Sequence, residues 1–306
     1  MKPKLIFITG PTSSGKTSVA VELAERTGGE IISCDSMQVY RGMELLTRAP
    51  SRDELSRVEH HLVGMLSAEE EFSAAEFAVR AEKLVEKILE SGKKPVFAGG
   101  TGLYIRSLLE GLFPSPPRDP GFRREMEALA EEKGSEYLYD MLRGTDPVSA
   151  GRLHPNDTKR IIRALEVRKL TGRTMNEKMR ESRGIGDAYD CRIFVLDIPR
   201  EKLYARIERS VDEMFEKGLA GEVQKLLRMD LSRTARKAIG VEEVSAYLKE
   251  EMTLEEAREE VKKNTRRYAK RQLTWFRGMD GAEWIDADRP VVEIVEEIIE
   301  RQKAKG

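Results

Sequence analysis

The most informative stretch of the sequence is Gly10-Pro11-Thr12-Ser13-Ser14-Gly15-Lys16-Thr17, which has the spacing of a phosphate-binding P-loop. Its glycines permit backbone angles at which successive N–H groups point inward and surround an anion. Lys16 would reach the outer phosphates, and the Thr17 hydroxyl would be a ligand for Mg²⁺. A glycine turn without a ligand would not need all eight residues. The pattern predicts a bound phosphate compound, but it does not say which compound or whether a phosphoryl group moves.

The segments on either side of this loop have the order that a P-loop requires. The apolar run Leu5-Ile6-Phe7-Ile8 before it reads as a buried strand, and residues 18–26 after it have a helical apolar stripe. The helix N-terminus would add partial positive charge beside the bound anion. The motif is therefore predicted to lie at a strand-to-helix turn of an α/β fold.

Two further loops are predicted to lie at the same edge of the sheet. A second strand at residues 30–34 ends at Asp35-Ser36, and a third at residues 95–98 opens into Gly99-Gly100-Thr101-Gly102-Leu103-Tyr104. Ligands of open parallel sheets bind beyond the carboxyl ends of the strands. Asp35 and Thr101 are therefore expected near the P-loop.

Asp35 has two possible roles on the residues alone. As a general base it would accept a proton from a second substrate, which suits group transfer from a phosphate ester to a nucleophile. As a carboxylate beside the P-loop it could equally be an outer ligand of Mg²⁺. Thr101 could simply cap the helix that follows it, the common role of threonine in such a turn.

A change of composition predicts a second domain. Four prolines fall between residues 114 and 120, and from residue 121 to about 186 only helical patterns occur. A strand pattern resumes at residues 192–198, and the remainder is mainly helical. We expect an α/β protein with a P-loop parallel sheet core, residues 1–113 and 187–306, a helical C-terminal region, and an inserted helical domain at 114–186.

The overall composition points to a globular protein outside membranes. Apolar residues make up 40% and charged residues 35% of the chain, and no apolar run reaches the length of a membrane span. The two cysteines form no framework or metal motif, which fits a reducing compartment. The net charge of −1 gives no global sign of a polyanionic partner, so RNA would have to meet a local patch. We expect a monomeric cytoplasmic protein.

One such patch is the segment from Lys262 to Arg277, in which basic residues alternate with Tyr268, Trp275 and Phe276. Basic residues can bind a phosphate backbone while aromatic rings stack on bases. The same pattern also suits an amphipathic helix whose aromatic rings pack inward and whose bases are solvated. From the residues alone, the chain is thus either a P-loop small-molecule kinase with a helical lid or a transferase acting on RNA.

An ordered set of motifs resembles the bacterial tRNA dimethylallyltransferases, also called tRNA isopentenyltransferases. The resemblance extends from about residue 5 to residue 277. Besides the P-loop, the matching segments are residues 35–43 (DSMQVYRGM), 60–62 (HHL), 99–104 (GGTGLY), 154–157 (HPND), 163–167 (RALEV) and 264–276 (NTRRYAKRQLTWF).

The resemblance implies a reaction and a set of partners. In that family a dimethylallyl group moves from dimethylallyl diphosphate to N6 of adenosine 37, beside the anticodon, in tRNAs reading codons that begin with U. The inserted helical domain grips the tRNA anticodon stem-loop, and Mg²⁺ assists the leaving diphosphate. The P-loop would then serve prenyl transfer without any phosphoryl transfer.

The resemblance also implies residue roles. Asp35 would be the general base, with Thr101 near the donor diphosphate and Lys16 stabilising its departure. The diphosphate would be bound by the P-loop residues Gly10, Pro11, Thr12, Ser13, Ser14, Gly15, Lys16 and Thr17 and by Arg209. The tRNA would be contacted by Asp35, Ser36, Met37, Gln38, Thr101, Arg123, Lys159, Arg160, Ile161, Ile162 and Arg163.

The chain departs from the family pattern at several positions. After Met43 the family usually has an acidic residue followed by Ile-Gly-Thr-Ala-Lys-Pro, whereas Arg48 and Ala49 stand here before Pro50. Val241 replaces a usual tyrosine, and Lys159 replaces a common glutamine. These departures leave the expected chemistry unchanged and concern the way the tRNA docks.

Overall fold

The computed structural model describes residues 2–113 and 116–303. The chain forms two compact units, one made of the segments up to Leu108 and from Gly186 onward, the other of Leu109–Ile185. The predicted boundary at residue 114 lies outside the described residues.

The first unit is built on a six-stranded parallel sheet with the strand order β3-β2-β4-β1-β5-β6. The strands are β1 (Lys4–Thr9), β2 (Gly29–Ser33), β3 (His60–His61), β4 (Lys94–Ala98), β5 (Asp190–Asp197) and β6 (Ala282–Asp286). The short edge strand β3 was not predicted, because two residues are too few to show an alternating pattern. The predicted α/β class with a P-loop parallel sheet is confirmed.

Both faces of β1 are buried, which explains its continuous apolar run. Ile6 and Ile8 pack into the same core as Val19 and Leu23 of the helix that follows the P-loop. Phe7 stacks instead on Phe97 of β4, with ring centroids 4.4 Å apart. Successive side chains of a strand point to opposite faces of the sheet, so the apolar residues of β1 are turned toward the helices on both faces.

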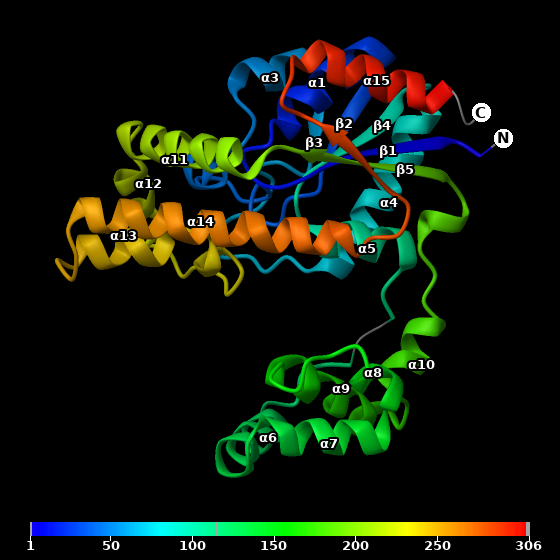
Figure 1. The fold of residues 1–306 in the computed structure, drawn as a ribbon, viewed down its shortest axis with the longest axis vertical. Helices are drawn as coiled ribbons and strands as arrows, with labels where there is room; N and C mark the ends of the chain where they lie inside the picture. Colours follow the sequence, from blue (N-terminus) through cyan, green and yellow to red (C-terminus); the bar gives the residue numbers. More distant parts are fainter. Residues whose placement is uncertain (1, 114–115, 304–306) are drawn as a thin grey trace. The chain divides into compact units, whose positions relative to one another are not determined.

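Helices cover both faces of this sheet, and α1 and α15 lie together on one side with α4 on the other (Figure 1). The helices of this unit are α1 (Lys16–Thr27), α2 (Glu44–Thr47), α3 (Arg52–Arg57), α4 (Ala74–Glu90), α5 (Gly102–Glu110), α11 (Arg200–Glu216), α12 (Leu219–Leu226), α13 (Val241–Leu248), α14 (Leu254–Arg277) and α15 (Val291–Lys303). No helix among the described residues is long and apolar enough to cross a membrane.

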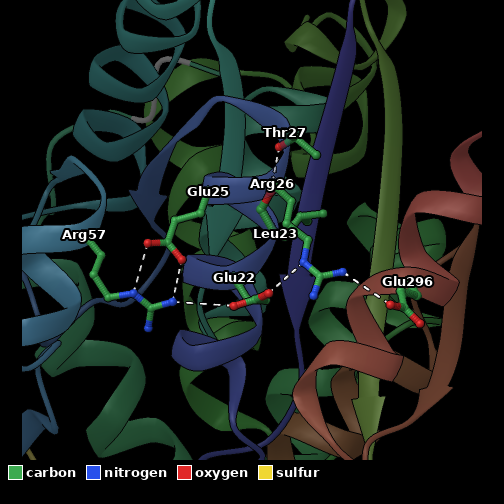
Figure 2. A network of polar contacts seen from close by, with 7 residues as sticks. All are labelled: Glu22, Leu23, Glu25, Arg26, Thr27, Arg57 and Glu296. Carbon is green, nitrogen blue, oxygen red and sulfur yellow. Dashed lines mark hydrogen bonds and ion pairs between the residues drawn. The ribbon is translucent and has the colours of Figure 1, made fainter.

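Ion pairs at the surface tie α1 to its neighbours (Figure 2). Arg57 of α3 contacts Glu25 and, at 3.5 Å, Glu22 of α1. On the other side, Arg26 of α1 contacts Glu296 of α15 at 3.5 Å. Exposed pairs of this kind contribute only about 0–1 kcal/mol each. Burial of Val19 and Leu23 therefore accounts for most of what holds the P-loop helix in place.

The second unit is a helical cluster with its own core. It contains α6 (Pro120–Lys133), α7 (Ser135–Thr145), α8 (Pro147–Ala150), α9 (Thr158–Thr171) and α10 (Met175–Arg180). Leu138 and Leu142 of α7 pack against Ile161 and Leu165 of α9. Asp157 caps α9 by accepting a hydrogen bond from the Arg160 backbone N–H at 3.3 Å.

Candidate active site

The P-loop joins β1 to α1 and has positive φ angles at its glycines, as the sequence predicts. Gly10 has φ of +141°, and a Cβ there would lie 2.8 Å from the backbone oxygen of Leu196 in β5. A side chain at this position would therefore push the loop off the sheet. Gly15, in a left-handed conformation, immediately precedes α1, so the helix N-terminus and its free N–H groups face the loop.

The loop forms one wall of a cavity of about 700 Å³ in the first unit. This volume suits a small-molecule ligand, for which pockets of roughly 300–1,000 Å³ are usual. Side chains from several parts of the chain line it. They include Thr12, Ser13, Lys16 and Thr17 of the P-loop, Asp35, Ser36, Met37 and Gln38 after β2, Thr47 and Arg48 at the end of α2, and Tyr268, Arg271 and Gln272 of α14.

Lys16 is the cation at the centre of the P-loop. Its Nζ donates a hydrogen bond to the backbone oxygen of Pro11 at 2.7 Å. Burial lowers the pKa of Lys16 to about 8, although the charge of Asp35 acts in the opposite direction. A lysine whose charged form is destabilised by burial gains from a bound anion, because the anion restores the favourable environment that water supplied. This electrostatic state is suited to a phosphate ligand.

Asp35 lies in the same cavity, directly after the buried end of β2. Its Oδ1 accepts a hydrogen bond from the backbone N–H of Met37 at 2.9 Å, which closes a local turn. Among the described residues Oδ2 accepts no hydrogen bond. One carboxylate oxygen is therefore held by the chain, and the other is left for a substrate or a metal ion.

Thr101 reaches this loop from the turn after β4. Its hydroxyl accepts a hydrogen bond from the Ser36 backbone N–H at 3.1 Å, and its own N–H donates to the Cys34 oxygen at 3.1 Å. Thr101 is not among the residues that line the cavity. It therefore positions the segment that carries Asp35 and Ser36.

Helix α14 closes the site from the far end of the sequence. Gln272 accepts a hydrogen bond from the Thr12 backbone N–H at 2.8 Å and donates one to the Gly100 oxygen at 3.0 Å. A Cβ on Gly102 would lie 2.1 Å from the Trp275 ring, so the helix can approach only because that residue is glycine. One helix thus joins the P-loop to the glycine turn after β4.

The aromatic residues of this basic segment differ in burial, because Tyr268 and Trp275 are only partly buried. Phe276 is fully buried, and burial raises the pKa of Tyr268. The Arg271 guanidinium lies over the Tyr268 ring, 5.6 Å from its centroid. Stacking on a base is therefore excluded for Phe276 in this fold, whereas Tyr268 lines the cavity. Arg267, Lys270 and Arg277 remain exposed.

Arg209, predicted to bind the diphosphate, is exposed on α11 and does not line the cavity. Its neighbour Ser210 does line it, as do Glu213 and Met214 one turn further on. The face of α11 that meets the cavity is thus adjacent to Arg209 and does not include it. The predicted role of Arg209 gains no support from this geometry.

In the second unit, two of the predicted tRNA contacts are held by a buried carboxylate. Arg123 donates to Glu166 Oε1 at 2.8 Å and to Oε2 at 2.7 Å, and Arg163 contacts the same Oε2. Burial alone would raise the pKa of Glu166, but these hydrogen bonds outweigh it and lower the pKa to about 2. Removing either arginine would leave a buried charge poorly paired, which is strongly destabilising.

The remaining predicted contacts of α9 divide by burial. Ile161 and Ile162 are 0% and 3% exposed and belong to the core of the unit. Their side chains are therefore not accessible to RNA in this fold. Lys159 is exposed, and the Arg160 side chain is 68% exposed. These two cations are the accessible members of the predicted set.

The donor atoms around the P-loop fit a hard divalent cation. Thr17 and Asp35 both line the cavity, and hydroxyl and carboxylate oxygens are the ligands that Mg²⁺ prefers. The described residues contain no cluster of three or more histidine, cysteine, aspartate or glutamate side chains that could hold a metal ion. A Mg²⁺ ion here would therefore share its coordination with the phosphate ligand and water.

Arg48 and Gln272 are among the cavity residues that were not predicted as site residues. Arg48 appeared in the sequence only as a departure from a pattern, and Gln272 only as part of a basic segment. A signal for Gln272 was present, because it falls on a helical stripe with buried Thr265, Ala269 and Phe276. A polar residue on a buried stripe indicates a partner inside the fold.

The fold and the cavity together define an α/β protein in which a P-loop and the carboxylate of Asp35 line one cavity. A family model described as IPP transferase matches residues 38–279. A protein named tRNA dimethylallyltransferase 2 from Geotalea daltonii is 46% identical over 301 residues, which cover 98% of this chain and 92% of that one. A tRNA dimethylallyltransferase from Acetivibrio thermocellus is 44% identical over 287 residues, 93% and 92% of the two chains.

Solved structures of proteins with the same kind of name are also similar to this chain. The full-length tRNA isopentenylpyrophosphate transferase of Bacillus halodurans matches with a TM-score of 0.73 and 40% identity, covering 99% of this chain and 98% of that one. A eukaryotic dimethylallyltransferase acting on tRNA matches with a TM-score of 0.74 and 28% identity, covering 93% and 74%. The chain belongs to the IPP transferase family.

Proposed function

We propose that the protein transfers a dimethylallyl group from dimethylallyl diphosphate to N6 of adenosine 37 in tRNAs that read codons beginning with U. The observation that carries this proposal is the identity of 46% over nearly the whole chain to a tRNA dimethylallyltransferase. The cavity supports it, because a phosphate-binding loop and the carboxylate of Asp35 line the same space. Group transfer needs both.

The residues divide between the two halves of the reaction. The bond between the allylic carbon and the diphosphate oxygen breaks, and its electron pair leaves with the diphosphate. The P-loop amides and Lys16 stabilise that charge. Mg²⁺, held by Thr17 and the diphosphate, would neutralise part of it. The allylic carbon bonds to N6 of adenosine, and Asp35 accepts the N6 proton.

The target base must leave the anticodon loop stack to reach Asp35. Ser36, Met37 and Gln38 line the cavity beside Asp35, and we propose that they contact the extruded base. The tRNA anticodon stem-loop would be held by the second unit, with Lys159 and Arg160 contacting phosphates. We propose a monomeric enzyme, and its tRNA substrate supports action in the cytoplasm.

The proposal is tested by incubating the protein with labelled dimethylallyl diphosphate, Mg²⁺ and unmodified tRNA, followed by digestion to nucleosides. We expect the label in a modified adenosine, and only when all three components are present. Turnover of ATP with a small acceptor, without labelled adenosine, would contradict the proposal and favour a P-loop small-molecule kinase. A tRNA with guanosine at position 37 is the matched control and should remain unlabelled.

Charge reversal of Lys159 and Arg160 tests the role of the second unit. The double variant Lys159→Glu/Arg160→Glu is expected to weaken tRNA binding and lower the slope of log affinity against log salt by about one unit per lost contact. Acidic residues in the first turn of α9 suit the helix dipole, so the fold should persist. The control is Lys83→Glu/Lys87→Glu on α4, which changes the net charge equally at exposed positions. Equal slopes in the two variants would mean that Lys159 and Arg160 are only solvated.

A further inference from the structure

Arg48 enters the cavity from an unusual backbone conformation. It directly follows α2 with φ of +50°, in the left-handed region where residues other than glycine are uncommon. Its N–H donates to the backbone oxygens of Glu44 and Leu45, and its own oxygen accepts from Gln38 Nε2 at 3.1 Å. The backbone of Arg48 is therefore held on both sides, and this fixes where the side chain begins.

The guanidinium of Arg48 lies against the P-loop. Its Nη1 donates to Thr12 Oγ1 at 2.6 Å and to Ser13 Oγ at 3.1 Å. Its Nε is buried and has no hydrogen-bond partner within residues 2–113 and 116–303, and the same is true of the neighbouring Thr47 hydroxyl. Both residues line the cavity. A guanidinium has five N–H donors, so these two hydroxyl acceptors leave part of its capacity unused.

The charge of Arg48 is also uncompensated. Among the described residues, neither Arg48 nor Lys16 has a carboxylate at ion-pair distance. Burial lowers the pKa of Arg48 to about 10, against the opposing influence of the Asp35 charge. Two cations therefore face one cavity, and desolvated cations without a counter-ion are costly. An anion bound between them would offset that cost.

We propose that Arg48 is a second cationic contact for the diphosphate of the allylic donor, adjacent to Lys16. The proposal rests on the proposed function for the identity of the donor. The anion that fits is one of high charge, because the P-loop amides, Lys16 and Arg48 all face it. When the carbon–oxygen bond breaks and its electron pair stays with the diphosphate, the Arg48 N–H groups stabilise the added charge. Arginine suits this role because its fork of donors matches phosphate oxygens.

A purely structural role is the competing explanation, since Arg48 could simply brace the P-loop through Thr12 and Ser13. Two substitutions distinguish these roles. Arg48→Gln keeps N–H donors for the two hydroxyls but removes the charge. Arg48→Met removes both. If Arg48 only braces the loop, Arg48→Gln should behave like the parent, whereas a diphosphate contact should be lost in both variants.

The measurement is the affinity of the intact protein for inorganic diphosphate, by titration calorimetry. We expect both variants to bind it about 10- to 100-fold more weakly, the loss typical of a hydrogen bond to a charged group. The control is Arg52→Gln, an exposed arginine on α3 that does not line the cavity. Its affinity should equal that of the parent. Parent-like affinity in a folded Arg48→Gln variant would overturn the proposal.

These outcomes are separable from those for the proposed function. If the parent binds diphosphate through Arg48 but labels no adenosine, the transferase proposal fails and the anion contact stands. If the parent labels adenosine and Arg48→Gln binds diphosphate like the parent, only the Arg48 proposal fails.

Discussion

Replacing Asp35 by asparagine is expected to slow the single-turnover rate of dimethylallyl transfer by about 10²–10⁴-fold. The amide can still hydrogen-bond N6 of the adenosine, but at neutral pH it cannot accept the proton. Its oxygen can also keep the contact with the Met37 N–H, now 2.9 Å from Asp35 Oδ1, so the loop should hold its shape. The loss should therefore be confined to the chemical step.

A titration of that rate against Mg²⁺ decides between the two roles of Asp35. For a general base, donor affinity and Mg²⁺ dependence in Asp35→Asn should stay close to those of the parent. For a metal ligand, high Mg²⁺ should restore most of the rate and donor affinity should fall. Recovery at high Mg²⁺ would thus overturn the general-base assignment. The variant Thr101→Val is the comparison for Asp35→Asn. It removes the hydrogen bond that Thr101 accepts from the Ser36 N–H, but it leaves the Asp35 carboxylate in place.

Lys16→Ala is expected to lower the transfer rate by about 10²–10³-fold, the usual cost of losing one group that stabilises charge in a transition state. tRNA affinity should change little, because in the proposed function the P-loop binds the donor and not the tRNA. If tRNA binding fell by the same factor, the P-loop would have been assigned to the wrong substrate.

The same variant should also change the pH profile. Lys16 in the free protein has a pKa of about 8, so its charged form predominates below that pH and is lost above it. In the parent, kcat/KM should therefore decline as pH rises through about 8, since this parameter reports groups of the free enzyme. The decline should be absent from the Lys16→Ala profile. A decline of equal size in the variant would assign it to another group.

Patterns in the sequence were sufficient to predict the sheet core and the edge at which the site lies. The strand β1 and the P-loop were readable because a buried strand, a glycine turn and a helix each have a local signature. Asp35 could be placed near the P-loop because parallel strands end at a common edge. Its role could not be decided, because a carboxylate at that edge can bind a metal or accept a proton.

The basic residues show where prediction failed. Arg123, Arg163 and Arg160 looked alike in the sequence, yet the first two neutralise buried Glu166 and only the third is mostly exposed. An arginine pattern shows where the charge is, but it does not show whether the carboxylate partner is buried, as Glu166 is, or partly exposed, as the Asp157 partner of Arg160 is. Glu166 lies on α9, three residues from Arg163, and folding brings it to Arg123 of α6.

By itself the sequence determined the α/β class, the phosphate-binding loop, and the carboxylate and threonine at its edge, because these depend on residues close together in the chain. The tertiary structure alone decided that Arg48 and Gln272 belong to the site and that Arg209 lies outside the cavity lining. Gln272 is 260 positions from Thr12 in the sequence, yet its side-chain oxygen accepts a hydrogen bond from the Thr12 backbone N–H. The physical reason is that a side chain's partner and burial depend on helices packing across the sheet, which no local period encodes.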